Sequence, residues 1–263
     1  MRIAVLLKEV PDTYSDRDMN LETGLTDRSG DVVADEVGER AVEAALRIVE
    51  AAGTTGGDGE HQVDVLTVGP ASAADAARRG IAMGANEAFV VTDEALTGAD
   101  LTLTAQVLAE LVRKQGYDLV LTGAMSSDGG GGVIAPMLGE LLGWPCLSNL
   151  TELNVEATSV RGTQASDGAT VQLSAELPAV ASVADEFADP RYPNFKGLMA
   201  AKKKEVTTFS LADLGIDAND FTHPRAIMVA IERRPARERG EIIDASSTSA
   251  TQLVDFLESK NLI

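Results

Sequence analysis

The sequence predicts an α/β fold in which helices cover both faces of a largely parallel sheet. Three observations lead to this prediction. Short apolar runs typical of buried strands alternate with amphipathic helical patterns, the connecting segments have helix-capping residues, and the second half has shorter runs that alternate apolar and polar residues. The last pattern predicts that the sheet is extended by antiparallel strands.

Four apolar runs in the first half are predicted to be buried strands. They are RIAVLLKEV (2–10), QVDVLTVGP (62–70), AFVVTDEA (88–95) and YDLVLTGA (117–124). Helical patterns lie between them, so the strands are expected to be parallel.

Three helices are expected to begin at polar N-caps, namely Asp35, Ser72 and Asp100. The first has an apolar stripe and ends at Gly53; the third has another stripe facing the core. These stripes consist of Val37, Ala41, Ala44, Leu46 and Ile48 in the first helix, and of Leu101, Leu103, Val107, Leu108, Leu111 and Val112 in the third.

Three later runs, at 147–156, 159–164 and 169–177, alternate and are separated by turn residues, which predicts the antiparallel extension. The glycine-rich segment 53–61 is expected to be a surface loop. From residue 217 the pattern is irregular until a last amphipathic helix in 249–263. We therefore expect a main domain over 1–216 and a C-terminal arm over 217–263 that packs on another subunit.

Composition limits the function. With 263 residues and 44% apolar residues the chain can bury a large core, and it has no apolar run long enough to span a membrane. We expect a protein that is not exported and not membrane-inserted; the single cysteine, Cys146, fits a reducing cytoplasm. A net charge of −19 repels nucleic acid and resembles the surfaces of proteins from high-salt cytoplasm.

The candidate site is the segment TGAMSSDGGGGVIAPMLGEL, which follows the strand ending near Thr122 and opens a helix near Gly132. Glycines allow close approach of a ligand, and free N–H groups at a helix start favour a phosphate, so a nucleotide is expected there. The segment matches neither GxxxxGK[ST] nor GxGxxG, and no lysine is expected beside it, which argues against phosphoryl transfer.

Catalytic patterns are scarce. His61, His223 and Cys146 fall in no recognised motif, and each is expected to be structural. A carrier or binding protein is therefore favoured over an enzyme.

Several motifs together resemble the β subunit of electron transfer flavoprotein. They are KEVPDT (8–13), GIAMGANEAFVV (80–91), TGADLTLTA (97–105), the glycine loop after Asp128, and DPRYPNFKGLMAAKKK (189–204). The resemblance extends from Met1 to about Ile216. It implies a three-layer, Rossmann-like fold similar to adenine nucleotide α-hydrolases.

The resemblance also implies a function. The β subunit pairs with an α subunit that holds the redox-active FAD, and the heterodimer carries electrons from acyl-CoA dehydrogenases and related flavoenzymes to a membrane quinone reductase. The β subunit holds a structural AMP. The residues implied for that pocket are Leu6, Asp35, Glu36, Val37, Gly38, Val68, Gly123, Ala124, Met125, Ser126, Ser127, Asp128, Gly129, Gly130, Gly131, Gly132, Val133 and Ile134.

Two departures leave alternatives open. The family often has Asn-Pro where Asp35 and Glu36 stand, and two carboxylates beside a phosphate would repel it unless they point away. The pattern from Asp128 to Pro136 also resembles the electron-bifurcating branch, in which a second FAD replaces AMP. A stand-alone adenine-nucleotide-binding protein, either a stress-type sensor or a ligase, is a third possibility. A ligase would have a pyrophosphate-binding loop directly after the first strand, and this sequence has none there.

The segment 184–205 resembles the family's recognition loop, in which an exposed apolar side chain docks on the dehydrogenase. Phe195 stands at the anchor position, and Leu198 and Met199 are expected to open a short helix that ends near the three lysines 202–204. The residues implied for docking are Pro190, Arg191, Tyr192, Phe195, Leu198 and Met199.

Overall fold

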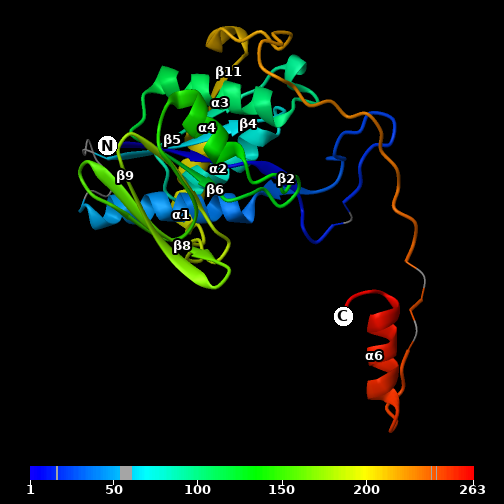
Figure 1. Cartoon of the computed structure of the whole chain (residues 1–263). Coiled ribbons are helices and arrows are strands. Elements are labelled where there is room, and N and C mark those ends of the chain that lie inside the picture. Colours follow the sequence, from blue (N-terminus) through cyan, green and yellow to red (C-terminus); the bar gives the residue numbers. More distant parts are fainter. Residues whose placement is uncertain (16, 54–60, 238, 241) are drawn as a thin grey trace. The chain divides into compact units, whose positions relative to one another are not determined.

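The computed structural model describes residues 1–15, 17–53, 61–237, 239–240 and 242–263. Two compact units are distinguished, Met1–Val229 and Ala230–Ile263. The first holds the sheet and all but the last helix (Figure 1).

A nine-stranded sheet forms the centre of the first unit, in the order β11-β5-β4-β1-β6-β10-β7-β8-β9. The pairings from β11 to β7 are parallel, and β7–β8 and β8–β9 are antiparallel. The strands are β1 Arg2–Leu6, β4 Gln62–Val68, β5 Glu87–Val91, β6 Leu119–Gly123, β7 Cys146–Val155, β8 Ser159–Ser166, β9 Ala169–Glu176, β10 Ala179–Val183 and β11 Thr207–Phe209. The mostly parallel sheet and its antiparallel extension are thus confirmed.

Helices cover both faces of the sheet, which makes three layers. In Figure 1, α3 and α4 lie above the sheet and α1 lies below it. Successive residues of β1 point to opposite faces: Val5 belongs to the core shared with α1 and α2, whereas Ala4 belongs to the core shared with α3 and α4. The helices of this unit are α1 Glu36–Ala51, α2 Ala73–Met83, α3 Leu101–Gln115, α4 Ile134–Leu142 and α5 Phe195–Lys203, with short 3-10 turns η1 Glu94–Leu96 and η2 Ala212–Leu214.

The predicted caps agree with the structure at two of three positions. The carboxylates of Asp35 and Asp100 accept hydrogen bonds from Gly38 N and Leu103 N, at 3.3 and 2.9 Å. The helix α2 does begin directly after Ser72, its N-cap position, but the Ser72 hydroxyl donates to the buried Glu9 at 2.9 Å and makes no side-chain cap.

Other expectations need correction. Leu101 is 45% exposed, although it was predicted to face the core, because α3 begins there and its first turn lies at the edge of the helix layer. Three strands were not predicted: β10, β11 and the short β3, Val32–Ala34. The predicted surface loop at 53–61 falls mostly outside the described residues.

A separate two-stranded antiparallel sheet, β2 Glu9–Pro11 with β3 Val32–Ala34, follows β1. It closes an N-terminal excursion over residues 12–31. The segment from Arg2 was expected to be one strand through Val10, but the chain leaves the main sheet after Leu6. This departure directs the excursion toward the carboxyl edge of the main sheet.

In the second unit, the described residues include the helix α6 Ser249–Ser259. None of its residues is buried, and Leu253, Val254 and Phe256 are all exposed. Residues 217–229 belong to the first unit, where Ala226 N donates to Asp100 at 2.7 Å. Within the described part of the chain, no helix has the length and apolar character needed to cross a membrane.

Candidate functional site

The candidate site lies where the strand order changes direction. From β1 the chain adds β4 and then β5 on one side, and it crosses to the other side with β6. In open α/β sheets, ligands bind beyond the carboxyl ends of the strands at this kind of switch point. The loop after β6 is the predicted glycine segment, 124–133.

Close packing brings this loop to the start of α1. A Cβ added at Gly123 would lie 2.9 Å from the carbonyl carbon of Val37, so only glycine lets the end of β6 approach the first turn of α1 so closely. The backbone N–H of Ser127 then donates to the carboxylate of Asp35 at 2.9 Å. The first turn of α1 and the loop after β6 therefore form one structure.

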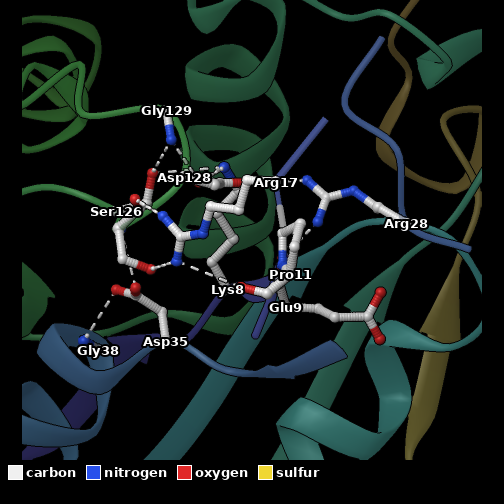
Figure 2. Close-up of polar contacts among 11 residues, drawn as sticks. Lys8, Glu9, Pro11, Arg17, Arg28, Asp35, Gly38, Ser126, Asp128 and Gly129 are labelled. Atoms are coloured by element: carbon white, nitrogen blue, oxygen red, sulfur yellow. Dashed lines mark hydrogen bonds and ion pairs between the residues drawn. The ribbon is translucent and has the colours of Figure 1, made fainter. Parts of the chain in front are cut away.

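Asp35 is buried, and its two carboxylate oxygens accept from Gly38 N and Ser127 N (Figure 2). The neighbouring Glu36 is exposed. The carboxylate of Asp35 is thus bound by two backbone N–H groups of the protein, and its effect on a bound phosphate stays a prediction.

Asp128 is the centre of a charged network at the glycine loop (Figure 2). Its side chain is 5% exposed and forms ion pairs with Lys8 at 2.7 Å and Arg28 at 3.1 Å. The N–H of Gly129 also donates to it at 2.6 Å. Burial raises the pKa of Asp128, but the hydrogen bond and charge of Lys8 outweigh this effect and lower the pKa to about 2.

A third cation comes from the N-terminal excursion. Arg17 donates to the carbonyl of Ser127, and its guanidinium lies 3.3 Å from both the Ser127 hydroxyl and the carbonyl of Pro11. Arg28 also donates to the carbonyl of Glu9 at 3.1 Å. Three cations, Lys8, Arg17 and Arg28, therefore lie at this loop together with the carboxylates of Asp35 and Asp128.

The prediction that no lysine would stand beside the loop is wrong. Lys8 Nζ donates to Asp128 and reaches the hydroxyl of Ser126 at 3.4 Å. No motif signalled this contact, since Lys8 and Asp128 are 120 residues apart and meet only because β1 and β6 are neighbours. Arg17 and Arg28 were missed for the same reason.

The start of α4 has backbone N–H groups that can act as hydrogen-bond donors to a ligand. Its N-cap, Val133, has no side chain that can cap, and the third residue of the helix, Pro136, has no N–H. Among the described residues, no acceptor is hydrogen-bonded to the N–H groups of Val133, Ile134 or Ala135. Free N–H groups at a helix start and three nearby cations fit a phosphate.

The structure gathers the predicted cofactor residues at one edge of the sheet. Leu6, Val68 and Gly123 end β1, β4 and β6; Asp35 to Gly38 begin α1; and 124–134 form the loop and the start of α4. Met125 and Val133 are exposed there. What these residues bind stays a prediction.

The second candidate region is the segment 184–205. Tyr192 is 84% and Phe195 79% exposed, and Leu198 and Met199 are exposed nearby. The helix α5 begins at Phe195, three residues earlier than predicted, because Asn194 caps it by accepting from Gly197 N at 2.8 Å. Lys202 and Lys203 lie in its last turn as expected, and Lys204 pairs with Glu87 at 2.7 Å.

Two of the predicted docking residues are not fully exposed to solvent. Arg191 turns its guanidinium toward α1, where it contacts Glu43 and Glu50. Pro190 is only partly exposed.

The histidines and the cysteine singled out in the sequence lie outside these two regions. His223 is exposed, and burial raises the pKa of the half-buried Cys146 thiol, which makes it less reactive. Across the described residues, no cluster of histidine, cysteine and acidic side chains could hold a metal ion.

The fold and site together define a mostly parallel α/β protein whose switch-point loop offers free backbone N–H groups and three nearby cations. The sequence matches the family model described as the electron transfer flavoprotein domain over residues 24–214. The protein named electron transfer flavoprotein subunit beta in Mycobacterium tuberculosis (strain ATCC 25618 / H37Rv) is 37% identical over 265 residues, which cover 99% of each chain.

Proteins of the same name give similar matches in other bacteria. The one from Mycobacterium leprae (strain TN) is 38% identical with 99% of each chain covered, and the one from Bacillus subtilis (strain 168) is 30% identical, covering 99% of this chain and 98% of the relative. The chain therefore belongs to the electron transfer flavoprotein family.

Proposed function

We propose that the chain is the β subunit of a heterodimeric electron transfer flavoprotein. Its partner is an α subunit that holds the redox-active FAD, and the heterodimer takes electrons from acyl-CoA dehydrogenases and related flavoenzymes and delivers them to a membrane quinone reductase. The observation that carries the proposal is the end-to-end similarity to proteins named as this subunit. FAD supplies the electron chemistry; this chain supplies binding and docking.

We also propose that the loop after β6 holds AMP. The free N–H groups at the start of α4 would bind the phosphate, and the cations around Asp128 would favour its charge. Leu6, Val68 and the first turn of α1 would form the rest of the pocket. The Asp128 to Pro136 pattern favours a second candidate, in which a second FAD of the bifurcating type occupies the same loop.

Two measurements test these proposals. Co-expression with an α-type subunit should give a yellow heterodimer with flavin absorbance; a colourless homodimer would instead indicate the stand-alone nucleotide-binding protein. Chromatography of the supernatant after denaturation separates AMP from FAD. Wild-type protein that releases no adenine nucleotide after gentle purification in high salt would contradict the pocket.

Gly131→Val tests the position of the nucleotide. A Cβ at Gly131 would lie 3.2 Å from the Leu101 side chain, so the substitution also strains the protein. Combining it with Leu101→Ala relieves that contact. If nucleotide content still falls at least about tenfold in the double variant, a ligand lies on the loop; if it recovers fully, the effect was internal to the protein.

We further propose a salt-rich cytoplasm as the working environment. The excess of 41 acidic over 22 basic side chains supports it, because molar salt screens their mutual repulsion.

A further inference from the structure

Within the first unit, a buried carboxylate of α1 holds the segment 184–205 in place. Glu43 lies in the middle of α1, and its side chain is 4% exposed. A buried charge is costly unless its oxygens are fully hydrogen-bonded, so the partners of Glu43 show its purpose.

Those partners come mainly from Arg191. Its backbone N–H donates to Glu43 Oε2 at 3.1 Å and its Nε donates to the same oxygen at 2.7 Å. Nη2 reaches Oε1 at 3.3 Å, where Arg47 Nε also donates at 2.6 Å. Glu43 therefore fixes both the main chain and the side chain of Arg191. Burial raises the pKa of Glu43, but these hydrogen bonds outweigh it, so the carboxylate stays charged.

The other contact of Arg191 is with an exposed carboxylate. Glu50, two turns further along α1, accepts from Nη1 and, at 3.0 Å, from Nη2, but it makes no hydrogen bond to the Arg191 main chain. Exposed ion pairs contribute little and are screened by salt, whereas the buried Glu43 also binds the backbone N–H of Arg191. Glu43 and Glu50 can therefore be compared as a buried and an exposed partner of the same arginine.

Other arginines hold the segment on either side. Arg40 pairs with Asp189 at 3.0 Å, and the guanidinium of Arg79 lies 5.2 Å from the ring centre of Tyr192. Arg78 donates to the carbonyls of Ala201 and Lys204 at the end of α5. Only three residues separate Arg191 from Phe195, and Pro193 among them is buried. Arg191 therefore helps to fix the chain that leads to the exposed Phe195, together with the packing of α5 on α2.

We propose that Glu43 is a positioning residue for partner docking. By holding Arg191 on α1, it presents Tyr192 and Phe195 in one orientation before the partner arrives, and this lowers the ordering cost of binding. Arg191, expected from the sequence to contact the partner, instead orients the residues that do. The inference rests on the proposed docking role of this segment.

The test uses the full chain in its heterodimer with the α subunit. Glu43→Gln keeps the size of the side chain and removes its charge; Glu50→Gln is the matched control on the same arginine. Reduction of the bound flavin by an acyl-CoA dehydrogenase is measured against heterodimer concentration. We expect Glu43→Gln to raise the apparent KM about fivefold or more with kcat, flavin content and dithionite reduction unchanged, and Glu50→Gln to change KM less than about twofold.

A double-mutant cycle with Phe195→Ala separates positioning from general damage. Phe195→Ala alone should raise KM at least about tenfold, and adding Glu43→Gln should raise it little further, because the anchor it positions is already gone. Independent, additive effects would overturn the inference, as would a normal KM in Glu43→Gln. If Phe195→Ala itself had no effect in folded protein, the docking role would fail instead. Should Glu43→Gln not fold, Arg191→Lys, which loses the forked contact, is expected to reproduce the KM change.

Discussion

Asp128 shows how one residue can organise a loop that has little structure of its own. It joins a loop after β6 to Lys8 after β1 and to Arg28 in the excursion. The folded-state pKa of about 2 lies below the ordinary value of 3.8, so the charged form is the one that the fold stabilises. That contribution is present above about pH 4 and is lost as pH falls toward 2.

Asp128→Asn should therefore lower the free energy of unfolding near neutral pH by about 1–2 kcal/mol, since it leaves Lys8 and Arg28 without their shared partner. The difference from wild type should shrink as pH falls from about 4 to 2. Urea unfolding at several pH values measures it. The control, Asp185→Asn, changes an exposed carboxylate and should have a small, pH-independent effect. A constant difference for Asp128→Asn would contradict the network.

For single residues, contacts with neighbours in the chain could be predicted from the sequence, whereas contacts with residues far away in the chain could not. Asp35 and Asp100 cap helices because the backbone N–H groups that donate to their carboxylates lie three residues away in the chain. Ser72 has the same local signal, but Glu9, 63 residues earlier, competes for its hydroxyl. Lys8 and Arg191 acquire their roles only through tertiary contacts, which no spacing rule contains.

At the scale of elements, the helix α5 packs very closely against α2. Gly197, in its first turn, faces the end of α2, and a Cβ there would lie 2.2 Å from the carbonyl oxygen of Ala82. No side chain can occupy that space, so a larger residue must displace α5 from α2.

Gly197→Ala is expected to lower the free energy of unfolding by about 1–3 kcal/mol through overpacking. Because Phe195 belongs to the same turn, docking on the dehydrogenase should weaken as well. Gly30→Ala is a matched control, since a Cβ there would meet nothing within 4 Å. Thermal unfolding and the KM for the heterodimer check both effects; a Gly197→Ala variant as stable as wild type would show that α5 is not tightly packed.

Elements with strong local patterns were predicted, and those without were missed. The apolar runs of β1, β4, β5 and β6 identified the parallel sheet. By contrast, β10 has the short run AVASV, whose small residues carry little pattern, although all five are buried between β6 and β7. β11 has only three residues. Its position depends on pairing with β5 and not on its own composition.

At the scale of the whole molecule, two of the regions with exposed apolar side chains form helices or lead into one. One is Tyr192 to Met199 with its aromatic residues, and the other is α6 with Leu253, Val254 and Phe256. The sequence indicated both, the first by resemblance and the second by its amphipathic pattern. Neither pattern could indicate which surface covers α6, because the apolar face of a helix specifies burial but not its partner.

Since α6 has no buried residue within the chain, we predict that it packs on the α subunit. Deleting Ser247 to Ile263 should weaken the heterodimer about tenfold or more in Kd, because the apolar face loses its burial site. Replacing both Leu253 and Phe256 by serine should reproduce much of this loss, whereas Asp255→Ser on the same helix should not. Co-purification yield and dilution-dependent flavin loss measure the effect. A truncated chain that co-purified at full yield and retained its flavin partner on dilution would show that α6 is not part of the subunit interface.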